Sequence, residues 1–469
     1  MVIDSFEGCD ILSKEANAKN QDMGTGSIPK LLAQLAIPAV VAQIVNLLYN
    51  IVDRIYIVHM PEVGAYALTG VGLFLPISMF ITAFAMLCGA GGAPRAASAM
   101  GQRNNDLAEK ILGNCFALLM CFAVVLTGVF YAAAPTLLRL FGASDVTLPY
   151  AVSYARIYIL GSVFVLTVMG MNVFITTQGF AKISMMTTVI GAVTNIILDP
   201  IFIFLLDMGV RGAALATIMS QAVGALWILR FLTGKQTTLR LKKENLRIQW
   251  PVIGPCLALG ISTFVMLSTE RLLSMSFTSS LAKSGGDLAV GAMTILTSCS
   301  QLITMPLSGI CQGGQPLISF NFGAGNRDRV KKAFFLQFGI CAAYATAFWA
   351  ALMLVPQVFV SIFNSDPALV QYTSWAMRIY MACIFSMGFQ LSCQQSFMAL
   401  GQAKISLLMA CLRKIILLIP LIFILPLFFE NKVMGVFLAE PVSDIIAALV
   451  TVIMFFTQFK TILDRGPAK

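Results

Sequence analysis

Apolar runs of about 20 residues, separated by short polar segments, follow one another along most of this chain. Each run is long enough to cross a hydrocarbon core of roughly 30 Å as a helix. The run LGNCFALLMCFAVVLTGVF, residues 112–130, lacks the alternation of apolar and polar positions that a membrane β-strand requires. The pattern therefore predicts an all-α membrane protein.

Twelve membrane-spanning helices are predicted from this pattern. The composition agrees, because 58% of the residues are hydrophobic and only 11% are charged, whereas soluble domains carry roughly 25% charged residues. The predicted spans cover residues 31–58, 65–88, 107–132, 151–177, 183–206, 212–233, 252–278, 288–312, 333–356, 372–398, 404–428 and 434–458.

Basic residues are concentrated in the loops on one side of these spans. The segment between the sixth and seventh spans alone contains Lys235, Arg240, Lys242, Lys243 and Arg247, while the opposite loops are richer in acids. Cytoplasmic loops carry an excess of Lys and Arg, so we predict that both termini are cytoplasmic, in a bacterial inner membrane. The net charge of +10 is then a topology signal, and no nucleic-acid partner is expected.

Several other functional classes receive no support from the sequence. The first 30 residues are polar and lack the apolar core of a signal peptide, which predicts a cytoplasmic tail. The eleven cysteines include no C-x-x-C pair, so neither a disulfide framework nor a cysteine metal site is expected. No P-loop, H-E-x-x-H or G-x-S-x-G motif occurs. We therefore expect a protein that is not an enzyme and needs no cofactor.

The two halves of the chain resemble each other. AMGQRNNDLAEKI and GAGNRDRVKKAF place Gly101 and Gly325 at matching positions, with an offset of 224 in the numbering. QGFAKIS and LGQAKIS match Gly179 with Gly401 at an offset of 222, and GAALAT matches GVFLAE at 223. Six spans is an even number, so both copies enter the membrane from the same side and are related by an axis along its normal. This predicts two pseudo-symmetric six-helix lobes around a central cleft.

The repeat sets the expected domain boundaries. Residues 234–251 form the longest polar stretch inside the chain, which we interpret as a solvated cytoplasmic linker between the lobes. The full division is a tail at 1–30, an N-lobe with helices 1 to 6 at 31–233, the linker at 234–251, a C-lobe with helices 7 to 12 at 252–458 and a tail at 459–469.

Polar residues share one helical face in the first predicted span. Asn46, Tyr49 and Asp53 are spaced i, i+3 and i+7, which places them on the same side of a helix. A charged side chain at membrane depth costs at least about 2.5 to 3.5 kcal/mol, so Asp53 requires a functional or structural reason. The alternative is an acid close enough to the interface to reach water.

The fifth predicted span has a second polar pair. Asn195 and Asp199 stand at i and i+4, and Pro200 follows, which frees a backbone carbonyl one turn earlier. Hard cations prefer such oxygen ligands, and a buried carboxylate without one suits proton carriage, so either ion is physically reasonable. At an offset of 222 the pair falls on Leu417 and Leu421, so the second half lacks it.

The second half contributes acids at other positions. At an offset of 224, Asn46 corresponds to Glu270 in LSTERLLSM. Thr217 corresponds to Glu440, which precedes Pro441 and which we interpret as either a site residue or an acid at a helix start near the outer rim.

These residues resemble the N-lobe cation-site pattern of the MATE family (multidrug and toxic compound extrusion transporters), in particular its bacterial multidrug branch. LAEPVSD around Glu440 is similar to a second-lobe counterpart, and Glu270 matches a seventh-helix acid of other branches. The resemblance covers nearly the whole chain. The N-lobe part rests on Asp53 after Asn46 and Tyr49, Asn172 in GMNVFITTQGFAKIS, Asn195, Asp199, and Thr217 in GAALAT.

The resemblance implies an antiporter that works as a monomer in the bilayer and exchanges Na+ or H+ for small organic, often cationic, compounds. The implied cation site is Asp53, Asn172, Asn195, Asp199 and Thr217, with Asp53 and Asp199 as ligands if the ion is Na+. The residues implied in substrate contact or accessory coupling are Asn46, Tyr49, Glu270, Gln394 and Glu440.

Two alternatives to an exporter stay open from the sequence. A lipid-linked saccharide flippase of related architecture would bring basic residues together in one cavity. The basic residues well inside the predicted spans are Arg54, Arg156, Arg271, Arg378, Arg413 and Lys414. A membrane receptor or membrane-embedded enzyme would lack a central cleft. The presence of both an N-lobe acid pair and Glu270 leaves open which lobe binds the driving ion.

Overall fold

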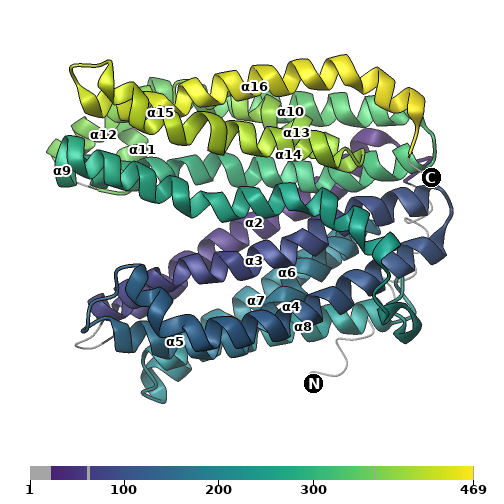
Figure 1. Cartoon of the computed structure of the whole chain (residues 1–469), viewed down its shortest axis with the longest axis horizontal. Helices are drawn as coiled ribbons and strands as arrows, with labels where there is room; N and C mark the ends of the chain where they lie inside the picture. The colour runs from purple at the N-terminus through teal and green to yellow at the C-terminus, as the bar shows by residue number, and fades with distance from the viewer. Residues whose placement is uncertain (1–22, 61–63, 365, 468–469) are drawn as a thin grey trace.

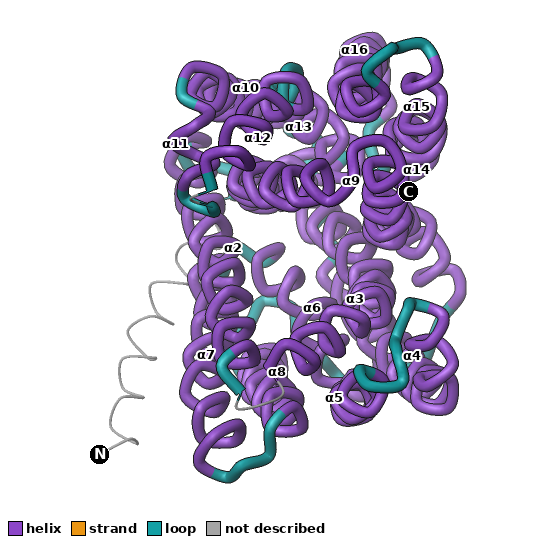
Figure 2. The backbone as a smooth tube through the Cα atoms, turned by 90° about the vertical axis from the view of Figure 1, so that its left-hand side faces the viewer, coloured by secondary structure: helices purple, strands orange, loops and turns teal. Residues whose placement is uncertain are grey.

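The computed structural model describes residues 23–60, 64–364 and 366–467, and every regular element in these ranges is a helix. Residues 1–22 of the predicted N-terminal tail and 468–469 of the C-terminal tail lie outside the described residues. The helices are arranged in two lobes that run along the same long axis (Figures 1 and 2).

The first lobe contains six spans. Side-chain caps help to set their ends, since Asn104 accepts a hydrogen bond from the Leu107 amide at 3.1 Å where the third span begins. The elements are α2 (Ile28–Val58), α3 (Gly64–Gly101), α4 (Asn105–Leu140), the bent pair α5 (Leu148–Leu160) and α6 (Ser162–Thr177), α7 (Ala181–Pro200) with the π-helix η2 (Ile201–Leu205), and α8 (Val210–Thr233).

The second lobe repeats this plan. The element α9 (Trp250–Gly323) consists of two helices, the seventh and eighth spans, which meet at a kink at Gly286, where φ is 63° and ψ is −158°. The remaining elements are α10 (Arg327–Leu354), α11 (Pro356–Ser361), α12 (Pro367–Tyr380) with α13 (Ser386–Ala399), α14 (Ala403–Cys411), the π-helix η4 (Leu412–Leu418), α15 (Ile419–Ile424), η5 (Leu425–Leu427) and α16 (Lys432–Arg465).

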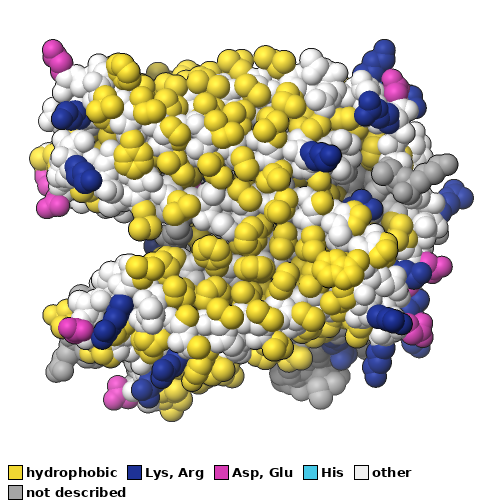
Figure 3. Space-filling model, viewed as in Figure 1, with side chains coloured by type: hydrophobic (Ala, Val, Ile, Leu, Met, Phe, Trp, Pro, Cys, Tyr) yellow, Lys and Arg dark blue, Asp and Glu magenta, His cyan; other side chains and the backbone are white. Residues whose placement is uncertain are grey.

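The predicted count of twelve spans is confirmed. Among the described residues, nine helices are long and apolar enough to cross a membrane, and the bent pair α5–α6 makes a tenth. The two halves of α9 count separately, and α12 with α13 forms the remaining span. Large apolar side chains such as Val124 and Leu140, 76% and 78% exposed, cover the outside of the bundle, as expected for a lipid-facing surface (Figure 3).

The lobes pack closely at the end of the molecule where the described ends of the chain lie. Arg329 of α10 donates hydrogen bonds to the carbonyls of Met23 and Gly26, which precede α2, at 3.0 and 2.8 Å. At the opposite end, the space-filling view shows a deep hollow between the lobes (Figure 3). The cleft therefore opens at one end only.

The closed end has reciprocal contacts between the lobes. A Cβ at Gly101 would clash with the Phe320 carbonyl, and a Cβ at Gly323 would clash with the Ser98 carbonyl. The same offset of 222 relates the two pairs, so each lobe makes the same contact on the other. Close backbone approach of this kind requires glycine and is typical of helix packing in membranes.

These contacts correct the predicted alignment of the first repeat motif. Asn104 and Asn326 are the N-caps of α4 and α10, and their numbers also differ by 222. The left-handed residue before each cap is Arg103, with φ 59°, in one lobe and Gly325, with φ 73°, in the other. The predicted match of Gly101 with Gly325 is therefore wrong by two positions, because glycine is not required at both left-handed positions.

The first and seventh spans need a different offset. Gly91 packs against the backbone of Cys256, and its counterpart Gly313 packs against Ala36. Ala36 and Cys256 are therefore equivalent, at an offset of 220.

With this offset, Glu270 corresponds to Asn50 rather than to Asn46, which corresponds to Met266. The predicted equivalence of Asn46 and Glu270 is wrong. The two lobes differ by two positions between the first and second spans of each half, and sequence comparison across short motifs did not locate that difference.

The linker is not a freely solvated loop. Gln178 accepts hydrogen bonds from the Thr237 hydroxyl at 2.7 Å and the Leu239 amide at 2.8 Å, and the Leu239 side chain is fully buried. Glu109 forms an ion pair with Lys242 at 2.6 Å, and its hydrogen bond and negative charge raise the pKa of Lys242. The segment between α8 and α9, which includes the short 3-10 helix η3 (Lys243–Leu246), is thus held against the first lobe.

Candidate cation and substrate sites

Two carboxyl groups meet inside the first lobe. Asp53 lies on α2 and Asp199 on α7, and the two carboxyl groups are within hydrogen-bonding reach of each other. Asp199 is fully buried and Asp53 is partly buried. Like charges at this distance repel strongly in a low dielectric, so the pair needs a shared proton or a bound cation.

Several oxygen atoms around this pair have no hydrogen-bond partner. Asn195 donates to Oδ1 of Asp199 at 3.3 Å, which leaves Oδ2 of Asp199, Oδ1 of Asn195 and Oδ1 of Asp53 buried and without a partner among the described residues. A buried polar atom without a partner costs roughly 1 to 3 kcal/mol. Carboxylate and amide oxygens of this kind are the ligand type that a hard cation prefers, and a proton would also satisfy a carboxylate.

Tyrosine and threonine side chains complete the surroundings of the pair. Tyr49 lies one turn before Asp53 on α2, and Tyr154 and Tyr158 of α5 lie close enough to interact with its charge. The hydroxyl of Thr217 on α8 donates to the Ala213 carbonyl at 3.0 Å and lies near Tyr154. The two tyrosines of α5 were not among the sequence candidates, although YARIY places them at i and i+4.

The end of α7 explains how Asp199 is presented. Pro200 directly follows the aspartate, and the chain then widens into the π-helix η2 rather than continuing as an α-helix. Short π segments inside helices are frequent at functional sites, because they redirect side chains and leave backbone groups unpaired.

Asn172 lies apart from this group. Its side-chain amide donates to the Ser184 carbonyl at 3.2 Å, in the first turn of α7. Ser184 lies about four helical turns before Asp199, which corresponds to a rise of about 22 Å. The structure therefore does not bring Asn172 to the aspartate pair, because the matching motif lies at the opposite end of the helix pair α6–α7.

Asn46 is half-buried on α2, and its carbonyl accepts a hydrogen bond from the Asn50 side chain at 2.6 Å. Asn46 and Tyr49 share the face of α2 that carries Asp53, as the spacing predicts.

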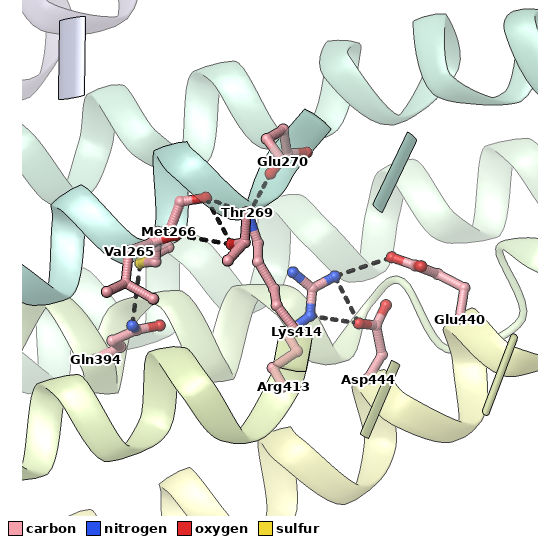
Figure 4. A network of polar contacts seen from close by, with 9 residues as sticks. All are labelled: Val265, Met266, Thr269, Glu270, Gln394, Arg413, Lys414, Glu440 and Asp444. Carbon is pink, nitrogen blue, oxygen red and sulfur yellow. Dashed lines mark hydrogen bonds and ion pairs between the residues drawn. The ribbon is translucent and has the colours of Figure 1, made fainter. Parts of the chain in front are cut away.

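The second lobe contains a charge network of its own (Figure 4). Arg413, in the π-helix η4, donates to Asp444 at 2.7 Å and to Glu440 at 3.0 Å, both on α16. The neighbouring Lys414 pairs with Glu270 of α9 and donates to the Met266 carbonyl at 2.9 Å. Gln394 of α13 also reaches Met266, with its amide nitrogen 3.2 Å from the sulfur.

This network changes two expectations from the sequence. Glu440 is not a solvated acid at a helix start, because its side chain is 14% exposed and paired with Arg413. The second half, which lacks the Asn195–Asp199 pair, was expected to contribute Glu270 and Glu440, and it contributes a further buried acid, since Asp444 is 2% exposed. The lobes differ in whether basic side chains neutralise their acids. The second lobe pairs its acids with Arg413 and Lys414, whereas the acid pair of the first lobe forms no salt bridge within the described part of the chain. Basic residues in mid-span were the sequence signal for this network.

Replacing Arg413 with methionine should destabilise the protein strongly. Removal of one partner from a buried ion pair costs roughly 3 to 5 kcal/mol, because the remaining charges stay buried. The exposed pair Arg327–Asp464 offers a matched control, since such pairs contribute about 0 to 1 kcal/mol. Thermal unfolding in detergent should show a much larger loss for Arg413→Met than for Arg327→Met, and equal losses would contradict the buried network.

Comparisons with known proteins agree with this architecture. The sequence model of the MatE family matches residues 38–201 and 260–424, which is most of the chain. The chain belongs to the MATE family. The two matched stretches fall in the two lobes, as expected for a duplicated scaffold.

Relatives of this MATE protein include the multidrug export protein MepA of Staphylococcus haemolyticus, 23% identical over 426 residues that cover 90% of this chain and 93% of MepA. A crystal structure of MATE in the bent conformation superimposes with a TM-score of 0.89 at 23% identity, covering 95% of this chain and 99% of that one. A multidrug resistance MATE transporter in an outward-facing conformation gives 0.87 at 23% identity, covering 94% and 98%. The twelve-helix, two-lobe fold is thus shown.

Proposed function

We propose that this protein exports organic cations in exchange for Na+ or H+ by alternating access. The observation that carries the proposal is the buried Asp53–Asp199 pair, whose unpartnered oxygens are suited to a driving cation. The relatives named as multidrug exporters support the substrate class. The spans contain many apolar and aromatic side chains, which can bind bulky amphipathic compounds.

The proposed cycle follows from the shape of the molecule. The hollow opens at the end opposite the described chain ends, and the distribution of basic loops assigns the chain ends to the cytoplasm. The hollow then faces outward, where substrate leaves and the cation enters. Binding of the cation between Asp53 and Asp199 favours the conformation that opens inward to collect the next substrate.

Coupling between the two ligands is reciprocal. If the driving cation lowers the affinity for substrate by some factor, substrate lowers the affinity for the cation by the same factor. Neutralising Asp53 and Asp199 by a proton or Na+ removes negative charge that otherwise attracts an organic cation into the hollow. This gives a physical reason for exchange rather than co-transport.

The flippase alternative gains no support from the basic residues whose side chains the structure describes; the side chain of Arg271 lies outside the described part. Arg54, Arg156 and Arg378 are exposed, and Arg156 stacks over the Tyr131 ring at 5.5 Å. Arg413 and Lys414 are each paired with acids. A pyrophosphate headgroup would need several uncompensated cations in one cavity.

Inverted membrane vesicles that contain the protein should accumulate a fluorescent organic cation when the driving ion is more concentrated inside the vesicles than outside. Imposing a Na+ gradient at equal pH, and a pH gradient without Na+, separates the two driving ions, because only one should support uptake. Vesicles without the protein provide the baseline. Uptake that persists after both gradients are collapsed would contradict the proposal.

A further inference from the structure

The second lobe contains a cavity that the proposed cation site does not use. Its volume is about 40 Å³, enough for two or three waters or a carboxylate group and too small for a whole drug molecule. It lies between α9, α13 and the eleventh span. Thioether and amide side chains form most of its wall, and two cations complete it: Met266, Met387, Gln394, Met409, Arg413 and Lys414.

The two cations of this cavity are held differently. Arg413 is locked by Glu440 and Asp444, which are both largely buried. Lys414 has a single carboxylate partner among the described residues, Glu270, and it also donates to the Met266 carbonyl. Lys414 is therefore the cation whose partner can be exchanged without breaking a buried pair of acids.

The Lys414–Glu270 pair is unequal in its access to water. The Lys414 side chain is 9% exposed, whereas that of Glu270 is 57% exposed. Glu270 lies between Trp250 and the turn at Gly286, about 30 Å and 24 Å from these two ends of the first half of α9. A charged group at mid-span that is half exposed needs water rather than lipid, so we infer that Glu270 faces the hollow between the lobes.

A second hydrogen-bond donor points to the same place. Gln394 is 3% exposed, and its amide nitrogen is directed at the sulfur of Met266 at 3.2 Å. A thioether is a weak acceptor, so this N–H is poorly satisfied where it lies. An anionic oxygen beside Lys414 would be a much better acceptor for it.

The geometry points to a binding site for the carboxylate of an amphipathic substrate, in which Lys414 and Gln394 hold the anionic group and Glu270 occupies the position when no substrate is bound. This inference extends the proposed export function and depends on it, because the bound compound is a substrate only if the protein exports it. The cavity accepts only the carboxylate, so the body of the compound lies in the hollow, against Met266 and neighbouring apolar side chains.

Two dyes that differ only in the carboxyl group provide the test. Rhodamine 19 is a free acid, and rhodamine 6G is its ethyl ester with the same cationic ring system. Fluorescence anisotropy with the purified full chain in nanodiscs gives a Kd for each dye without any ion gradient. The measured quantity is the ratio of the two Kd values, ester over acid, because general changes in dye binding cancel in it.

Glu270→Gln removes the internal competitor and should raise this ratio about tenfold, the lower end of what a charge-assisted hydrogen bond contributes. Lys414→Met should lower the ratio about tenfold. Lys331→Met, at an exposed lysine of α10, is the matched control and should leave the ratio unchanged. Where Lys414→Met alone does not purify as a folded protein, the double variant Glu270→Gln/Lys414→Met removes both charges and should show the same low ratio.

The inference would be overturned if the Kd ratio in Glu270→Gln equals that of the parent protein. It would also be overturned if both variants that lack Lys414 keep the parent ratio. Because binding is measured without a gradient, its failure is distinguishable from failure of export. Export of rhodamine 6G with no effect of these substitutions on the ratio would leave the proposed function standing and reject the carboxylate site. A shifted Kd ratio without export by the vesicles would support the carboxylate site and contradict the proposed function.

Discussion

Asp53→Asn and Asp199→Asn should each abolish gradient-driven export while the protein remains folded. Each change keeps the size of the side chain and removes one of the two charges that would hold the driving cation. Loss of one charge-assisted contact costs about 1.5 to 3 kcal/mol, so the affinity for the ion should fall roughly tenfold to 150-fold. Vesicle uptake of a fluorescent cation, at the gradient that drives the parent protein, measures the effect.

Asp145→Asn is the control for these variants, because Asp145 is an acid of the same lobe whose side chain is 98% exposed. It should transport as the parent does. Thermal unfolding in detergent separates loss of transport from loss of fold: neutralising either member of a repelling buried pair should leave stability unchanged or increase it. Normal export by both aspartate variants would show that the driving ion binds elsewhere, with the acids of the second lobe as the next candidates.

The spans could be predicted because a lipid environment leaves the backbone few choices, and a run of apolar residues is then sufficient to define a helix. The ends were less predictable. The second span was predicted to end at residue 88, yet α3 continues to Gly101. Its last turns, GAGGAPRAASAMG, contain small residues that hydropathy scores poorly. Gly91 and Gly101 among them pack against the other lobe, and Gly89 and Gly92 pack against helices of their own lobe.

The candidate site in the first lobe was predictable where the polar residues share one helix. The spacing of Asn46, Tyr49 and Asp53, and that of Asn195 and Asp199, fixes a common face without knowledge of the fold. The contact between the two helices is a tertiary fact, and sequence reasoning reached it only through the family resemblance. Asn172 shows the limit of the family resemblance, because a motif match does not tell at which level along the helix axis a residue lies.

The network in the second lobe was missed for a related reason. Arg413 and Lys414 were recognised as basic residues inside a span, but their partners lie 27, 31 and 144 residues away. Charge alone does not say whether such residues form one uncompensated cavity or separate ion pairs. The register of the repeat would have helped only if the difference of two positions between the first spans of the lobes had been known, since the wrong offset aligned Glu270 with Asn46.

Gly260→Val should favour the conformation in which the lobes are open at the end of the molecule where the described ends of the chain lie. Gly260 faces the backbone of α3 so closely that a Cβ would clash with the Leu87 carbonyl, and its counterpart contact is Gly309 against Val40. Overpacking a tight contact costs typically about 1 to 3 kcal/mol, which shifts a two-state equilibrium roughly 5- to 150-fold. The proposed cycle separates the lobes at this end and breaks these contacts, so the penalty falls on the conformation whose hollow faces the other way.

A native cysteine reports on this shift. Cys256 lies one turn from Gly260 in the closed contact, and its side chain is fully buried. Labelling by a membrane-impermeant thiol reagent, located by peptide mass mapping, should accelerate at Cys256 in Gly260→Val. Gly254→Val is the matched control on the same helix, because a Cβ at Gly254 would meet no atom within 4 Å. Slow labelling and normal dye export in Gly260→Val, indistinguishable from Gly254→Val, would mean that closure of this glycine contact is not part of the transport cycle.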